Sequence, residues 1–126
     1  MKKILALSLL AAIMLFVQNS VIAQTNTTVL RHIVIITFKQ DAPADSITAL
    51  DNLYISLSKS PLVRDFEWGV NMSTRDTNVV KHIYATSFAS KEDIDSYRKL
   101  PEYPKLFKLS LPVAEDVTVA DYWAKK

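Results

Sequence analysis

Two similar segments decide the fold of this chain. Residues 32–38 read HIVIITF and residues 82–88 read HIYATSF, so histidine, isoleucine and phenylalanine recur at the same places with an offset of 50 residues. Both segments are rich in β-branched and aromatic side chains, which favours strands. The recurrence predicts a domain built from two related halves.

A helix signal follows each of these strands. After the first, Asp41 and Pro43 precede apolar residues at helical spacing, namely Ile47, Leu50, Leu53, Tyr54 and Leu57. After the second, Ser90 and Asp93 form a capping box before a further apolar series of Ile94, Tyr97 and Leu100. Both halves therefore predict a strand followed by a helix.

Each half then ends in a second strand, read from residues 63–71 and 116–123. The β-α-β order, found twice, predicts an α+β fold of the ferredoxin-like βαββαβ type with an antiparallel sheet. The run LFKLSL at residues 106–111 indicates an additional short helix, because Pro101 and Pro112 restrict the chain on both sides of it.

The first 23 residues have the layout of a Sec-type signal peptide. Lys2 and Lys3 precede an apolar run at residues 4–17, and the small-residue pattern VIA follows at 21–23. This run of 14 residues is shorter than the roughly 20 that a membrane-spanning helix needs. We therefore expect cleavage after Ala23, export to the periplasm or the medium, and no stable membrane insertion after cleavage.

Residues 24–29 are expected to form a flexible leader and residues 30–126 the folded domain. The mature chain of 103 residues would carry 13 basic and 13 acidic side chains, since the signal removes two lysines from the total of 15 basic residues. A neutral domain is not expected to bind nucleic acid. The lack of cysteine excludes disulfides, thiolate nucleophiles and Cys-ligated zinc.

Strand phase predicts a dimer. His32, Val34, Ile36 and Phe38 share one face of the first strand, which we assign to contact with the helices. The opposite face would present an apolar centre made by Ile33, Ile35, Ile83 and Ala85. Because water is unfavourable beside such a centre, a second subunit is expected to cover it in a twofold homodimer.

The sequence resembles the stress-responsive A/B barrel family of the dimeric α+β barrel superfamily. The resemblance runs from Leu30 to Tyr122 and rests on LRHIVIITFK at its start, FEWGVN at 66–71, KHIYATSF at 81–88, YRKLPEY at 97–103 and VADY at 119–122. It implies the same ferredoxin-like unit, with two sheets paired into a dimeric α+β barrel.

Members of this family that cyclise polyketides by aldol chemistry carry the segment Tyr-x-x-His-Pro-x-His, whose last histidine acts as general base. Here Tyr97 and Pro101 match, but Leu100 replaces the first histidine and Tyr103 the second. A tyrosine, with an ordinary pKa near 10, is a poor base at neutral pH. The resemblance therefore does not carry cyclase activity over intact.

The candidate catalytic residues are His32, His82, Tyr97 and Tyr103. The two histidines hold equivalent places on neighbouring strands and could lie close together as an acid-base pair, or could be structural and bonded to backbone. The candidate ligand-binding residues add apolar and aromatic lining to the same face: Val34, Ile36, Tyr84, Thr86 and Trp123. The same side chains could instead simply fill the core.

No metal site or cofactor is expected. Both histidines come from separate strands and lack a tight ligand spacing, although haem proteins occur among relatives in the superfamily. Gly69 is the only glycine, which excludes glycine-rich phosphate loops. Within a strand it indicates a bulge, a positive φ or the close approach of another backbone.

These observations favour an exported homodimer that binds a small, partly apolar organic molecule between sheet and helices. One alternative is a cofactor-free, cyclase-like acid-base enzyme that acts next to a carbonyl group, with His32 or His82 as the base and Tyr97 or Tyr103 orienting the oxygen. The other is a non-catalytic stress or envelope protein. The sequence leaves open whether the protein is an enzyme.

Overall fold

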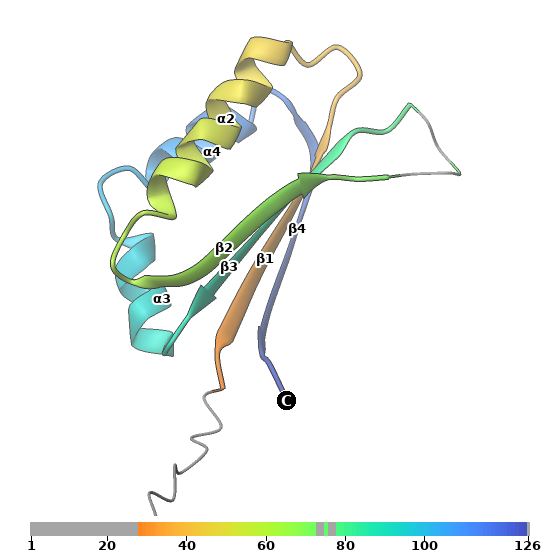
Figure 1. Ribbon diagram of the computed structural model, residues 1–126. Helices are drawn as coiled ribbons and strands as arrows, with labels where there is room; N and C mark the ends of the chain where they lie inside the picture. Colours follow the sequence, from red (N-terminus) through yellow and green to blue (C-terminus); the bar gives the residue numbers. More distant parts are fainter. Residues whose placement is uncertain (1–27, 73–74, 76–77, 126) are drawn as a thin grey trace, which may run out of the picture.

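Four antiparallel strands form one sheet, and the helices lie together on one of its faces (Figure 1). This computed structural model describes residues 28–72, 75 and 78–125. The elements in chain order are β1 (Leu30–Phe38), α2 (Ala44–Leu57), β2 (Val63–Val70), β3 (Lys81–Phe88), α3 (Lys91–Arg98), α4 (Pro104–Ser110) and β4 (Ala114–Trp123). The predicted ferredoxin-like α+β fold is confirmed.

The two similar segments form the centre of the sheet. The strand order is β2-β3-β1-β4, so β1 and β3 pair with each other and are flanked by β2 and β4. Along β1, buried residues alternate with half-buried ones. His32, Val34, Ile36 and Phe38 lie on the buried, helix-covered face, as the strand phase predicts.

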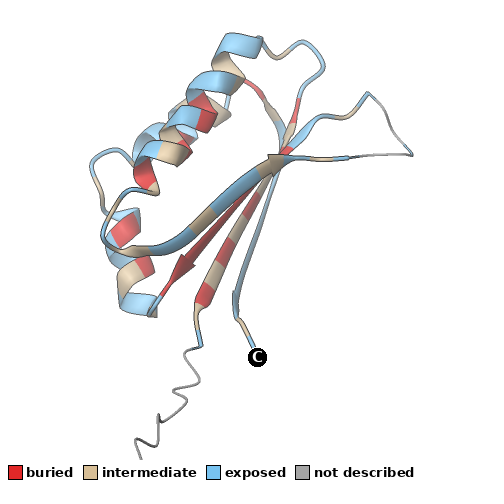
Figure 2. Cartoon of the chain, viewed as in Figure 1, coloured by how far each residue is buried: buried red, intermediate tan, exposed pale blue. Residues whose placement is uncertain are grey.

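The core lies between this face and the helices (Figure 2). Apolar side chains of β1 and β3 pack there against those of α2, α3 and α4. Its least exposed apolar members are Leu50, Tyr84, Phe88 and Ile36. Burial of apolar area at about 25 cal/mol per Å² makes this layer the main source of stability.

The helix boundaries follow their end signals. Ser90 caps α3, since its Oγ accepts the backbone N–H of Asp93 at 3.1 Å. Helix α4 begins at Pro104, two residues before the stretch expected from the sequence. Proline suits this place because its missing N–H has no partner in the first turn of a helix.

The other face of the sheet carries the predicted apolar centre. Ile33, Ile35 and Ile83 are half-buried there, and Ala85 is buried, with 7% of its surface exposed. In the described part of the chain, no helix crosses this face (Figure 1). The three half-buried isoleucines are therefore available for contact with another surface.

Gly69 lies on this same face, opposite Ile83, and the expectation of special backbone there is wrong. Its φ is not positive, and it is not at the register shift of β2, which falls between Val63 and Asp65. A Cβ placed on Gly69 would meet nothing within 4 Å. The glycine instead leaves a hollow on the face away from the helices.

The expected signal peptide, residues 1–23, lies outside the described residues, as does most of the expected leader. Within residues 28–72, 75 and 78–125, no helix combines the length and apolarity that crossing a bilayer requires.

Candidate functional site

A cavity of about 270 Å³ lies between β1, β4 and α4 on the helix-covered side of the sheet. Its wall is mostly apolar and includes four polar side chains. The apolar lining residues are Val34, Ile36, Tyr54, Leu106, Phe107, Leu111, Val117 and Val119, and the polar ones are His32, Arg98, Tyr103 and Ser110. This composition is typical of a site for a small organic molecule.

The cavity exists because the edge strand β4 is incompletely covered. Val117 and Val119 line it, yet they remain 47% and 52% exposed. Phe107 and Leu111, on the α4 side, are also exposed. An apolar groove therefore opens to solvent between the last helix and the last strand.

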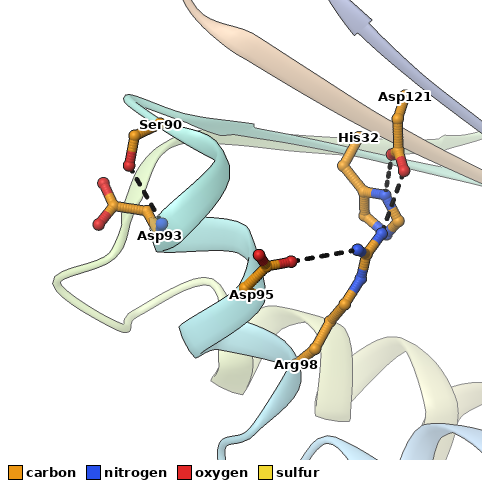
Figure 3. Close-up of polar contacts among 6 residues, drawn as sticks. All are labelled: His32, Ser90, Asp93, Asp95, Arg98 and Asp121. Atoms are coloured by element: carbon orange, nitrogen blue, oxygen red, sulfur yellow. Dashed lines mark hydrogen bonds and ion pairs between the residues drawn. The ribbon is translucent and has the colours of Figure 1, made fainter.

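His32 and Arg98 both line this cavity. Each contacts Asp121, which is not part of the lining (Figure 3). Nδ1 of His32 is hydrogen-bonded to Oδ1 of Asp121, the residue paired with it on β4. Arg98, at the end of α3, donates from its guanidinium to the other oxygen of Asp121 at 3.0 Å and lies 3.8 Å from Asp95. The arrangement holds the imidazole in one orientation.

Asp121 is ionised in this arrangement. Partial burial alone would raise its pKa, but the hydrogen bond and charge of His32, followed by those of Arg98, outweigh burial and lower the pKa below its ordinary value. A carboxylate in this state accepts hydrogen bonds and donates none. It therefore accepts from both His32 and Arg98.

His82 belongs to a separate cluster beneath α2. Its Nδ1 lies 2.8 Å from Oδ1 of the buried Asp51, and the same oxygen accepts the hydroxyl of Tyr84 at 2.6 Å. Burial, and then the hydrogen bond to Asp51, raise the pKa of Tyr84 far above its ordinary value, so the hydroxyl remains protonated and donates. Tyr84 also stacks on Tyr54, with ring centroids 3.7 Å apart.

The two histidines do not come together. His32 is opposite Thr86 in the sheet, whereas His82 is opposite Ile36. Since the neighbouring strands run antiparallel, equivalent places in the two segments fall towards opposite ends of the pair, four residues or about 13 Å apart. The idea of a histidine pair is wrong for this reason.

The two candidate tyrosines contact each other but differ in position. Their ring centroids are 5.5 Å apart in an edge-to-face arrangement. Tyr103 lines the cavity, whereas Tyr97 is buried against Phe88. Burial, and then the nearby Tyr103, raise the pKa of Tyr97, so its phenol remains protonated. Only Tyr103 is placed to meet a ligand.

The residues expected to bind a ligand divide in the same way. Val34 and Ile36 line the cavity. Tyr84 and Thr86 are buried in the interior of the sheet, and Trp123 is 48% exposed beyond Asp121, so these three lie outside the cavity lining.

Sequence reasoning missed the carboxylates that hold the histidines. Asp51 lies on the apolar side of its helix, one residue after the fully buried Leu50. A carboxylate at such a position indicates a buried hydrogen-bond partner. Asp121 is two residues from both Val119 and Trp123 on β4, so the three share one face, and Val119 lines the cavity on the helix-covered side. The partner of Asp121 could be found only from the register between β1 and β4.

A second hollow, of about 460 Å³, opens where β1 ends. It is lined by Phe38, Lys39, Gln40, Ala42, Ile47, Asn78 and Val80. Histidine and carboxylate side chains are absent from this lining, so we take the smaller cavity as the candidate site. Among the described residues, no three His, Asp or Glu side chains gather as metal ligands would.

Comparison with known proteins identifies the family. Residues 30–124 match the Stress Responsive A/B Barrel Domain. The chain belongs to this family. The A/B barrel domain is also 29% identical over 108 residues to a stress-response A/B barrel domain-containing protein of Arabidopsis thaliana, a match that covers 78% of this chain and 38% of that relative.

Solved structures share the fold of this A/B barrel domain. A hydroxynitrile lyase from Passiflora edulis superposes with a TM-score of 0.69 at 22% identity, covering 79% of this chain and 96% of the lyase. A dimeric protein of unknown function from Bacteroides fragilis has a TM-score of 0.59 at 22% identity, and the match covers 76% of this chain and 96% of that protein. A dimeric ferredoxin-like protein from Thermobifida fusca has a TM-score of 0.66 at 12% identity, and the match covers 79% of this chain and 93% of that protein. At these identities the likeness concerns the fold alone.

Proposed function

We propose that this A/B barrel domain binds a small, partly apolar organic molecule in the cavity between β1, β4 and α4. The observation that carries the proposal is the combination of an apolar, solvent-accessible cavity with an oriented histidine on its wall. Ligand sites commonly combine an apolar lining with a few fixed polar groups. A structural histidine alone would not need an open apolar groove beside it.

The size of the cavity limits the ligand. At about 30 Å³ per water, about 270 Å³ holds roughly nine water molecules. A ligand of about ten non-hydrogen atoms fits this space. Such a molecule would cover the exposed side chains of Val117, Val119 and Phe107, and burial of that apolar area would favour binding.

A cavity-filling variant tests the proposal. Val119→Phe adds a ring at the mouth of the cavity without touching the buried core, because Val119 is half-exposed. Val70→Phe is the matched control, since Val70 is 56% exposed on the opposite edge strand and does not line the cavity. We expect benzyl alcohol to shift backbone amide resonances of β4 and α4 in the wild type and V70F, and not in V119F. Equal shifts in all three proteins would contradict the proposed site.

A second candidate function is acid-base catalysis next to a carbonyl group. The specific observation in its favour is the hydrogen bond from His32 to Asp121, because a carboxylate that orients an imidazole is a common arrangement for a general base. Tyr103 lines the same cavity and supplies a hydroxyl for a carbonyl oxygen. The Passiflora edulis lyase shares the fold, and supports this candidate only to that extent.

Deuterium exchange separates catalysis from binding alone. The base would break a C–H bond beside the carbonyl and form an N–H bond on His32, and the reverse step in D₂O would return deuterium to the carbon. We would follow exchange into benzyl methyl ketone by NMR, with His32→Gln as the test and His82→Gln as the control. Exchange that is catalysed by the wild type and H82Q, and lost in H32Q, supports an enzyme. Binding without exchange supports the non-catalytic alternative.

We also propose a homodimer formed through the uncovered face of the sheet. Ile33, Ile35 and Ile83 supply its apolar centre, and the Bacteroides fragilis and Thermobifida fusca proteins of the same fold are dimeric. Ile35→Glu would place a charge in this interface, so light scattering at micromolar concentration should report a monomer. Val70→Glu, on the helix-covered face, should leave a dimer.

Export remains the third part of the proposal, and the lysine, apolar and VIA pattern of residues 1–23 supports it. Intact mass spectrometry of protein recovered after expression of the full chain should give a polypeptide that begins at Gln24. A mass that retains Met1 to Ala23 in all cell fractions would contradict export by cleavage.

A further inference from the structure

His32, on the wall of the cavity, restricts the chemistry of its ligand. Asp121 is ionised, as its lowered pKa indicates, and has no proton to give. The proton in its hydrogen bond with His32 therefore belongs to Nδ1 of the imidazole. The protonated imidazole, whose charge helps to lower the pKa of Asp121, donates from both ring nitrogens. Once the imidazole is neutral with its proton on Nδ1, the other nitrogen, Nε2, is a hydrogen-bond acceptor.

This acceptor is available to a ligand. The hydrogen bonds of His32 found in the described part of the chain use Nδ1 alone. The ring lines the cavity, and the histidine as a whole is only 6% exposed. Among the described residues, Ser87 Oγ is the buried side-chain polar atom without a hydrogen-bond partner, so Nε2 of His32 is reached by solvent. A donor that enters with the ligand would take the place of water at Nε2.

The charges around the ring disfavour an anion. Two carboxylates, Asp121 and Asp95, face one guanidinium, that of Arg98, whose nitrogens are directed to those carboxylates. With a neutral imidazole, this cluster has one more negative than positive charge. Arg98 is the only Lys, Arg, Asp or Glu among the described residues that line the cavity. A carboxylate ligand would therefore share the single guanidinium of Arg98 with two carboxylates, Asp121 and Asp95.

The geometry points to an uncharged ligand that presents a hydroxyl group, as an alcohol, phenol or enol, to Nε2 of His32. Its apolar body would lie along Val34, Ile36 and Val119. This inference rests on the proposed function and specifies the ligand class of that site. Asp121 acts in it as a positioning residue, because it selects the nitrogen that carries the proton.

Three probes of similar size test this inference at pH 8: benzyl alcohol, benzyl methyl ether and benzoate. The alcohol donates a hydrogen bond, the ether only accepts and benzoate is an anion. Titrations followed by the amide resonances of β4 and α4 should show the alcohol binding about fivefold more tightly than the ether, the effect of one net hydrogen bond. Benzoate should bind more weakly than the alcohol.

Two variants assign any preference to the histidine. His32→Phe keeps a ring of similar shape without the acceptor, so the alcohol and the ether should bind alike. Asp121→Asn allows the carboxamide to donate to Nδ1, which places the proton on Nε2, and should reduce the preference for the alcohol without abolishing binding. Thermal melts would establish that each variant is folded.

The outcomes separate the two claims. If the ether binds the wild type as tightly as the alcohol, or benzoate binds more tightly, the ligand class is wrong while the cavity remains a binding site. If none of the three probes shifts the amide resonances, both the ligand class and the proposed function fail. A preference that persists in H32F would also overturn the assignment to Nε2.

Discussion

His32 and Asp121 are cross-strand partners whose side chains form a hydrogen bond on the helix-covered face of the sheet. The pair joins β1, at the centre of the sheet, to β4, at its edge. Arg98 binds the same carboxylate from α3, so three elements meet at one carboxyl group. The ionisation of Asp121 therefore affects both the orientation of the histidine and the attachment of the edge strand.

The first prediction concerns the stability of the fold in acid. The lowered pKa of Asp121 means that the carboxylate is ionised more readily in the folded than in the unfolded chain. Its contribution is then fully present above the ordinary aspartate value of 3.8, and is lost as the pH falls below it through the folded-state pKa. Urea unfolding at pH 7 should show Asp121→Asn to be less stable than the wild type by about 1 kcal/mol or less, since the side chain is 39% exposed.

The difference between D121N and the wild type should shrink as the pH falls from about 4 towards 2. Glu115→Gln is the control, because Glu115 is exposed on the same strand. It should change stability little at either pH. A gap between D121N and the wild type that widens in acid would contradict the assigned direction of the pKa.

A second prediction concerns the start of α3. Ser90→Ala removes the acceptor for the N–H of Asp93 and should lower the free energy of unfolding by about 1 kcal/mol. Ser96→Ala changes an exposed serine inside the same helix and should be neutral or slightly stabilising, since alanine has the higher helix propensity. Equal effects of the two substitutions in urea unfolding would remove the capping role.

The sequence predicts the elements well because their signals are local. The β-branched and aromatic content of residues 32–38 and the apolar spacing of Ile47, Leu50 and Tyr54 depend only on neighbours along the chain. The site depends instead on contacts between distant residues. His32 and Asp121 are 89 positions apart, and their pairing follows from strand register. The repeat likewise indicates two equivalent histidines, but it does not contain the strand register. The antiparallel pairing of β1 and β3 separates the two histidines.

Gly69 shows a different limit of sequence reasoning, and it provides the third prediction. A valine side chain at this position would enter the hollow lined by Glu67, Trp68, Ile83 and Ala85 without a clash inside one chain. Gly69→Val should therefore keep the far-UV circular dichroism of the folded chain, and valine also suits a strand better than glycine. If a partner side chain occupies the hollow in the proposed dimer, the variant should dissociate at higher concentrations than the wild type.

Sedimentation velocity over a concentration series would measure that dissociation. Val70→Phe serves as the control, because Val70 lies on the helix-covered face of the same strand and should leave association unchanged. A folded G69V protein that dimerises as tightly as the wild type would show that the hollow does not receive the partner.

The fourth prediction concerns the buried cluster under α2, where Asp51 accepts from both His82 and Tyr84. Asp51→Ala leaves two buried donors without an acceptor, and should cost about 2–4 kcal/mol in the free energy of unfolding. Tyr84→Phe removes only one donor and keeps the ring stacked on Tyr54, so about 1 kcal/mol is expected.

Asn52→Ala is the matched control for the cluster, since Asn52 is the exposed neighbour of Asp51 on the same helix. It should change stability by less than about 0.5 kcal/mol. The cluster lies apart from the cavity, so Y84F should also bind benzyl alcohol as the wild type does. If D51A were no less stable than N52A, the hydrogen bonds of the cluster would not stabilise the packing of α2 on the sheet. If Y84F lost binding of benzyl alcohol, the two histidine sites would be coupled rather than separate.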